Sequence, residues 1–96
     1  MIEKSDHAFR VTAPMLIANA RALLQAGQAL LSVESGTEIL LDLERIQEVD
    51  SSALAVFFGL RRTAKVRGVK LRIVNPPASF ISLAGLYGVS DSLSLA

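Results

Sequence analysis

Apolar and polar residues follow one another along this 96-residue chain in patterns that predict strands alternating with helices. Residues 8–11 alternate and predict a short first strand. Residues 39–43 are almost continuously aliphatic, which is typical of a central strand covered on both faces. Residues 69–74 alternate again and predict a strand exposed on one side. Because helical patterns separate these strands, the fold class is α/β, a sandwich of a small mixed β-sheet covered by α-helices.

The first helix is predicted to start near residue 12. Thr12 suits an N-cap, and Pro14 suits the first turn, where a missing N–H costs nothing. Residues 15–25 are rich in Ala and Leu, and Gly27 is a natural stop. Residues 28–33 either extend this helix or form an irregular return, and the pattern leaves both open.

Two further helices are bounded by clear signals. The second is expected over residues 52–66 and is ended by Gly68, while the third is expected over residues 78–86, before Gly88. At about 100° per residue, one stripe of the second helix is apolar and should face the core. The members of this stripe are Ala53, Val56, Phe57, Leu60 and Ala64.

Length and composition predict a single domain over residues 1–96, in which residues 1–7 form a polar N-terminal tail. Although 51% of the residues are hydrophobic, no apolar run approaches the ~20 residues of a membrane span. This apolar surplus favours contact with a protein partner and is compatible with a homodimer in isolation. Ten basic residues against nine acidic ones argue against nucleic-acid binding. The lack of cysteine and of a signal-peptide pattern indicates a cytoplasmic protein.

Catalytic chemistry has few candidate residues. His7 is the only histidine and lies in the polar tail, so neither Ser51 nor Ser52 has a histidine base nearby in the sequence. No spacing of carboxylates suggests a metal site, and the singly scattered glycines form no phosphate-binding loop. The sequence therefore predicts a protein that is not an enzyme and that uses no metal or cofactor.

The start of the second helix carries the most informative polar residues. Asp50 and Ser51 are placed to cap this helix, because side-chain oxygens there accept hydrogen bonds from unpaired N–H groups of the first turn. A serine in this place can also present its hydroxyl to a partner or accept a phosphate. Capping and partner recognition both remain open from the residues alone.

An apolar flank follows this start. Leu54 and Phe58 lie one turn apart, and the basic residues Arg61, Arg62 and Lys65 continue the same flank. The flank either packs under a neighbouring helix or forms a docking face with an apolar centre and a charged rim.

The order of elements and several motifs resemble the STAS domain, the fold of sulfate transporters and anti-sigma-factor antagonists. The resemblance covers nearly the whole chain from Ala8 onward, and in such domains an Asp-Ser or Asp-Thr step opens the helix after a central strand. The motifs that carry it are Leu41-Asp42-Leu43, Val49-Asp50-Ser51-Ser52-Ala53-Leu54, Gly68, and Leu83-Ala84-Gly85-Leu86-Tyr87-Gly88-Val89.

Two branches of this family imply different partners. In anti-sigma-factor antagonists, a partner kinase phosphorylates the serine after the Asp, which by position is Ser51. In the MlaB-like branch, the STAS protein is a non-enzymatic subunit that binds the cytoplasmic ATPase of a phospholipid ABC transporter, which maintains outer-membrane lipid asymmetry. Antagonists usually carry Gly where this chain has Ala53, and an acid ahead of the first helix, where residues 11–14 have none. These departures favour the MlaB-like branch, with the antagonist as the alternative.

The resemblance implies a single interaction site at the second helix. The protein would bind the ATPase there, or an anti-sigma kinase on the alternative, and would be peripheral to the inner membrane only through its partner. A small-ligand-binding regulatory module is a third interpretation, for which no residue names a ligand. The expected partner-binding residues are Ser51, Ser52, Leu54, Ala55, Phe58, Arg62 and Lys65.

Overall fold

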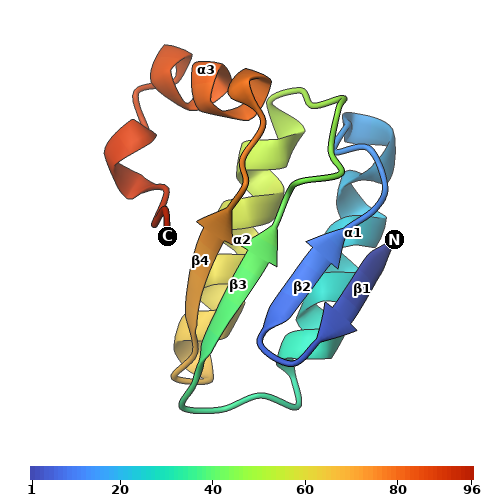
Figure 1. Cartoon of the computed structure of the whole chain (residues 1–96), viewed down its shortest axis with the longest axis vertical. Coiled ribbons are helices and arrows are strands. Elements are labelled where there is room, and N and C mark those ends of the chain that lie inside the picture. Colours follow the sequence, from blue (N-terminus) through green and yellow to red (C-terminus); the bar gives the residue numbers. More distant parts are fainter.

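One mixed sheet organises the chain, and the computed structural model describes all residues from 1 to 96 (Figure 1). Strands β1 (Ile2–Ser5) and β2 (Ala8–Val11) form an antiparallel hairpin. Strand β3 (Glu38–Asp42) pairs in parallel with β2, and β4 (Lys70–Val74) pairs in parallel with β3. The spatial order is therefore β1-β2-β3-β4, with β1 and β4 at the two edges.

Helices α1 (Ile17–Leu31) and α2 (Ser52–Val66) connect the parallel strands and cover the same face of the sheet (Figure 1). Helix α3 (Ala78–Leu86) lies beyond the end of β4 and leads into a short 3₁₀ turn, η1 (Ser90–Ser92). The predicted small mixed sheet with packed α-helices is confirmed, but the expectation that β3 is covered on both faces is wrong. None of the helices combines the length and the apolar character that a membrane span requires.

The apolar core lies between the sheet and helices α1 and α2. The stripe predicted for α2 is buried throughout, and Phe57 at its centre has no exposed surface. The two helices approach closely at Gly27, where an added Cβ would lie 2.5 Å from Leu60 Cδ2. A glycine there allows Leu60 to pack against the backbone of α1, because no side chain occupies the space.

The start and end of α1 differ from the prediction. The helix begins at Ile17 and not near Thr12, and it continues through Gly27 to Leu31. Met15 explains the late start: it is buried and forms an isolated parallel bridge with Val49, which keeps the preceding backbone extended. Gly27 does not stop the helix because its close contact with α2 favours a helical residue without a side chain.

The first residues also differ from the prediction, since residues 2–5 form strand β1 and not a polar tail. The backbone pairs Ile2 with Val11, and Ile2 packs against the core as a partly buried side chain. With one apolar residue among its four, β1 gives little hydrophobic pattern, and pairing with β2 supplies its stability.

Candidate docking surface at the start of helix α2

Asp50 joins the starts of two helices that are far apart in the sequence. Its Oδ2 accepts a hydrogen bond from the backbone N–H of Ile17 at 2.9 Å, in the first turn of α1. Its Oδ1 accepts from the backbone N–H of Ser52 at 2.8 Å, in the first turn of α2. The segments before the helices also pair, because the N–H of Asp50 donates to the carbonyl of Met15 at 3.1 Å. One carboxylate thus caps both α1 and α2.

These contacts hold the pKa of the Asp50 carboxyl below its ordinary value of 3.8, chiefly through the N–H of Ile17. The N–H of Ser52 adds to this effect, and together the bonds outweigh the loss of hydration, which acts in the opposite direction. Hydrogen bonds donated to a carboxylate favour its ionised form. Asp50 therefore carries a negative charge at neutral pH, where it complements the positive ends of two helix dipoles.

Ser51 occupies the N-cap position of α2, but its side chain makes no capping hydrogen bond. The expectation that Asp50 caps this helix is confirmed, and the expectation that Ser51 shares the role is wrong. The reason is local: Ser51 already has helical backbone angles, with φ −60° and ψ −19°, whereas a capping side chain usually needs extended angles. The exposed Ser51 hydroxyl is consequently free of internal bonds.

The outward face of α2 places most of the expected partner-binding residues on the surface. Ser51, Ala55 and Arg62 are exposed along one line of the helix, and Phe58 lies among them as a half-buried side chain. Ser52 is half-buried beside the start of this line.

Lys65 is exposed as well, seven residues after Phe58 and so on the same side of the helix, at the end of α2 that lies beside β4. Leu54 is only 6% exposed and belongs to the core, so it offers a partner almost no surface. Of the two alternatives for Leu54, packing within the chain is therefore correct and docking to a partner is not, because its side of the helix faces the core.

Phe58 is held in place by aromatic and cationic neighbours. Its ring centroid lies 5.2 Å from that of Phe57, and the Arg61 guanidinium carbon lies 4.9 Å from the Phe58 centroid. Arg61 also stacks on Phe57, at 5.6 Å. A ring fixed in this way loses little side-chain freedom when a partner covers it, which favours its use as an anchor.

Ile17 is a further apolar residue at this surface, and the sequence did not indicate it. Its side chain is 75% exposed, and its backbone N–H binds Asp50, which places it beside the start of α2. No local pattern indicates this role, since Ile17 and Asp50 are 33 positions apart. We use the term docking surface for Ile17, Ser51, Ala55, Phe58 and Arg62 together.

A second carboxylate, Asp42, lies apart from the docking surface at the end of β3. Burial alone would raise the pKa of Asp42, but hydrogen bonds from the Glu44 N–H, the Asn75 amide and Arg10 lower it below its ordinary value. The three bonds measure 2.9, 3.1 and 3.4 Å. Asp42 forms an ion pair with Arg10 of β2. Its bond with Asn75 adds a link to the end of β4, so this carboxylate has a structural role.

Comparison with solved structures shows the same fold in proteins of low sequence identity. The anti-sigma factor antagonist SpoIIAA, in its unphosphorylated form, has a TM-score of 0.74 at 15% identity, covering 95% of this chain and 82% of its own. An anti-sigma factor antagonist from Mycobacterium paratuberculosis has a TM-score of 0.70 at 19% identity, covering 99% of this chain and 81% of its own. A sulfate transporter family protein from Wolinella succinogenes has a TM-score of 0.68 at 16% identity, covering 91% and 70%.

Sequence comparison gives the family directly. Among curated proteins, none matches this chain significantly. A family model described as "Mlab, STAS domain" matches residues 2–95, and the chain therefore belongs to the STAS domain family.

Proposed function

We propose that this chain is a non-enzymatic interaction subunit, which binds and supports the cytoplasmic ATPase of a phospholipid ABC transporter that maintains outer-membrane lipid asymmetry. The observation that carries the proposal is the free Ser51 hydroxyl at the head of an exposed line with Ala55 and Phe58. The description of the matching family model supports the same branch.

The chemistry of the docking surface suits protein binding. Its centre is apolar, from Ile17, Ala55 and Phe58, and Arg62 stands at its rim. A buried aromatic anchor supplies most of the affinity in such an interface, while rim charges contribute mainly orientation and association rate. Ser51 is the polar group at the edge of this apolar centre, where its hydroxyl can donate or accept one hydrogen bond across the interface.

The alternative is an anti-sigma factor antagonist controlled by phosphorylation of Ser51. The exposed hydroxyl favours this second candidate as well, and three structural neighbours are described as anti-sigma factor antagonists, one of them provisionally. A phosphate on Ser51 would add about −1.5 to −2 charges next to the ionised Asp50. Because Asp50 already accepts the N–H of Ser52, the added phosphate would point outward and would repel an apolar or acidic partner.

The two candidates are separated by identifying the bound partner. The tagged protein is purified from its own cells under mild conditions, and the associated proteins and any phosphate on Ser51 are identified by mass spectrometry. An ABC-type ATPase with its permease supports the transporter subunit. A sigma-pathway kinase with phosphate on Ser51 supports the antagonist, and the recovery of neither class contradicts both.

A matched pair of variants tests the site itself. Ser51→Glu is expected to prevent recovery of the partner, because it places a negative charge at the edge of the apolar centre of the interface. Ser51→Ala is expected to retain the partner, and both variants should keep the thermal stability of the parent. Recovery of the partner with Ser51→Glu would remove this surface from the interface.

A further inference from the structure

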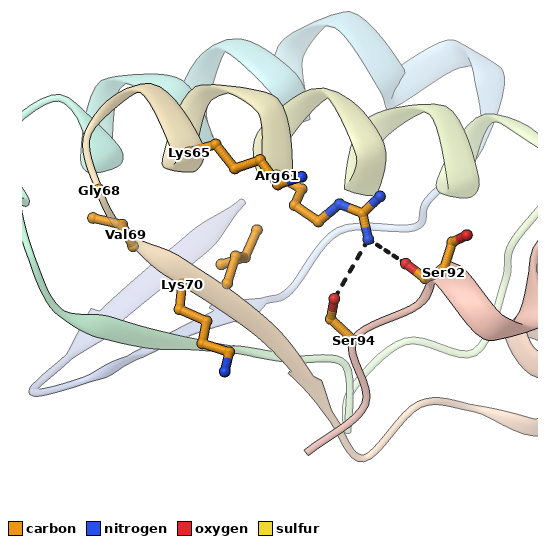
Figure 2. Close-up of a pocket in the computed structure, with 8 residues that line it drawn as sticks. Arg61, Lys65, Gly68, Val69, Lys70, Ser92 and Ser94 are labelled. Atoms are coloured by element: carbon orange, nitrogen blue, oxygen red, sulfur yellow. Dashed lines mark hydrogen bonds between the residues drawn. The ribbon is translucent and has the colours of Figure 1, made fainter.

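Arg61 connects two parts of the molecule that are far apart in the sequence, helix α2 and the C-terminal segment. Figure 2 shows its guanidinium directed towards Ser92 and Ser94. The same Nη1 donates to the carbonyl of Ser92 and to Oγ of Ser94, the latter at 3.4 Å. On the helix, the guanidinium carbon lies 4.9 Å from the ring centroid of Phe58. One side chain therefore contacts both the C-terminal segment and an aromatic residue of the docking surface.

No carboxylate fixes the direction of Arg61. The three ion pairs of the chain do not include it, and no acidic residue lines the cavity of about 480 Å³ that it borders. Its charge is met instead by the Ser92 carbonyl, the Ser94 hydroxyl and the rings of Phe57 and Phe58. A free arginine side chain has many rotamers. The C-terminal segment consequently helps to select the one that stacks on the rings.

The C-terminal segment is itself anchored, so it can hold Arg61 in one place. Leu93, between the two serines, is buried in the core. The carbonyl of Ser94 accepts the N–H of Ile73 at 3.0 Å, and the Ile73 carbonyl accepts the N–H of Ala96 at 2.9 Å. Both acceptors of Arg61 thus flank a buried residue and lie beside strand β4.

Ser94 has a backbone conformation that favours glycine. Its φ is +52°, in the left-handed region, where a Cβ crowds the following carbonyl. A glycine would adopt this conformation without that cost, but it would offer Arg61 no side-chain acceptor. The hydrogen bond that the Ser94 hydroxyl makes within the chain is the one from Arg61. A serine at this position is therefore explained by its bond to the guanidinium.

We propose that Arg61 is a positioning residue of the docking surface, which fixes the Phe58 ring as an anchor because the C-terminal segment fixes Arg61. This inference rests on the proposed function, in which a partner covers Phe58. A ring in contact with both Phe57 and the guanidinium enters an interface with little side-chain freedom left to lose. Without its serine acceptors, Arg61 turns towards solvent and Phe58 loses one of these two contacts.

The position requires an arginine and not merely a positive charge. Arg61 follows Phe57 by four positions and Phe58 by three, so the helix itself brings it to both rings. A planar guanidinium can stack on a ring while it donates to a carbonyl and a hydroxyl. The ammonium group of a lysine is a compact and strongly hydrated point charge, which cannot make these contacts together.

The first test is NMR spectroscopy of the free protein. Protons above the face of an aromatic ring are shifted upfield, so the Arg61 Hδ protons should resonate upfield of those of Arg67. Arg61→Gln and Arg61→Lys should each change the ring-proton shifts of Phe58. The matched control is Arg67→Gln, which removes the same charge and a bond to the Glu34 carbonyl at 3.0 Å. This control should leave the Phe58 signals unchanged.

Ser94→Gly separates positioning from stability. It removes the acceptor for Arg61, so the Arg61 Hδ signals should move towards those of Arg67. The Tm should stay close to that of the parent, because relief of the positive φ offsets the greater freedom of glycine in the unfolded chain. A purely structural role for Ser94 predicts instead a lower Tm with unchanged Arg61 signals.

The second test is calorimetric titration with the partner that is recovered with the tagged protein, expected to be the transporter ATPase. Arg61→Gln and Arg61→Lys should each weaken binding about fivefold, Ser94→Gly about threefold, and Arg67→Gln less than about twofold. Unchanged Phe58 signals in Arg61→Gln would overturn the inference in the free protein, whatever the partner. A parent protein that binds neither class of partner contradicts the proposed function, whereas equal binding by the parent and Arg61→Gln contradicts only the role of Arg61.

Discussion

The two ends of α2 use the same helix in opposite ways. At its start, Asp50 satisfies the N–H groups of two helices, so the residues left at the surface are a free hydroxyl and apolar side chains. At its other end, Lys65 and Arg61 lie beside β4 with no carboxylate partner, and the Arg61 guanidinium donates to the carbonyl of Ser92. One end of the helix leaves a hydroxyl and apolar side chains at the surface, and the other end leaves positive charge there.

The two ends of α2 suit different kinds of partner. A surface whose polar groups are satisfied binds mainly by burying apolar area, with little dependence on ionic strength. A surface whose cations have no carboxylate partner attracts acidic groups by charge, and salt weakens that attraction.

The largest effect is expected from Ala55→Glu in the middle of the docking surface. Ala55 is exposed, so a glutamate should leave the fold intact while placing a charge in the centre of the interface. We expect partner affinity to fall about 100-fold, measured by calorimetric titration with the purified partner. Ala22→Glu makes the same change on the outward face of α1 and should alter affinity by less than about twofold. Similar affinity for both variants would contradict the assignment of the surface.

The double cap by Asp50 predicts an asymmetry between neighbouring residues. Asp50→Ala removes the acceptor for the N–H groups of Ile17 and Ser52 and should lower the Tm by about 5 °C. Ser51→Ala removes no capping bond and should change the free energy of unfolding by less than about 0.5 kcal/mol. Thermal unfolding followed by circular dichroism measures the stability of both variants. An equal loss of stability in the two variants would show that Ser51 also caps the helix.

The lowered pKa values of Asp42 and Asp50 predict a loss of stability in acid. Both carboxyls have native pKa values below the ordinary 3.8, so the unfolded chain takes up protons first as the pH falls. Their contribution is fully present at neutral pH and is lost as the pH drops below about 4, through the native values. Denaturant unfolding between pH 7 and pH 3 should show a shallower decline for Asp50→Asn than for the parent, and an equal decline in both proteins would contradict this assignment.

The smallest effect concerns the turn that follows α2. Gly68 has a φ of +70°, and an added Cβ would meet only Gly36 backbone, at 3.8 Å, so Gly68→Ala should cost about 1 kcal/mol through backbone strain alone. Gly85 lies within α3, where a Cβ would meet Ser90 Oγ at 3.7 Å, and Gly85→Ala should instead stabilise by about 0.5 kcal/mol. Denaturant unfolding of the two variants should give changes in unfolding free energy of opposite sign, which would support this difference in backbone conformation.

Much of the fold was predictable because local signals agreed with the tertiary environment. The bounds of α2 and α3, the core stripe around Phe57 and the alternation of β4 all follow from periodicity together with Gly and Pro positions. Strand β1 and the true start of α1 were not predictable, because each depends on pairing with a distant segment. In the candidate site, the bond between Asp50 and the N–H of Ile17 was not predictable, because it joins residues 33 positions apart.

Local pattern and motif specified the order of elements from β2 to α3, the STAS resemblance and the Asp-Ser step at the start of α2. Only the tertiary structure decided that one carboxylate caps two helices, that Ser51 is free, and that Leu54 is buried while Ile17 is exposed. It also decided that Arg61 and Lys65 lie beside β4 and the C-terminal segment. The physical reason is that hydrogen-bond partners and burial depend on which distant segments meet in space, which local sequence pattern does not encode.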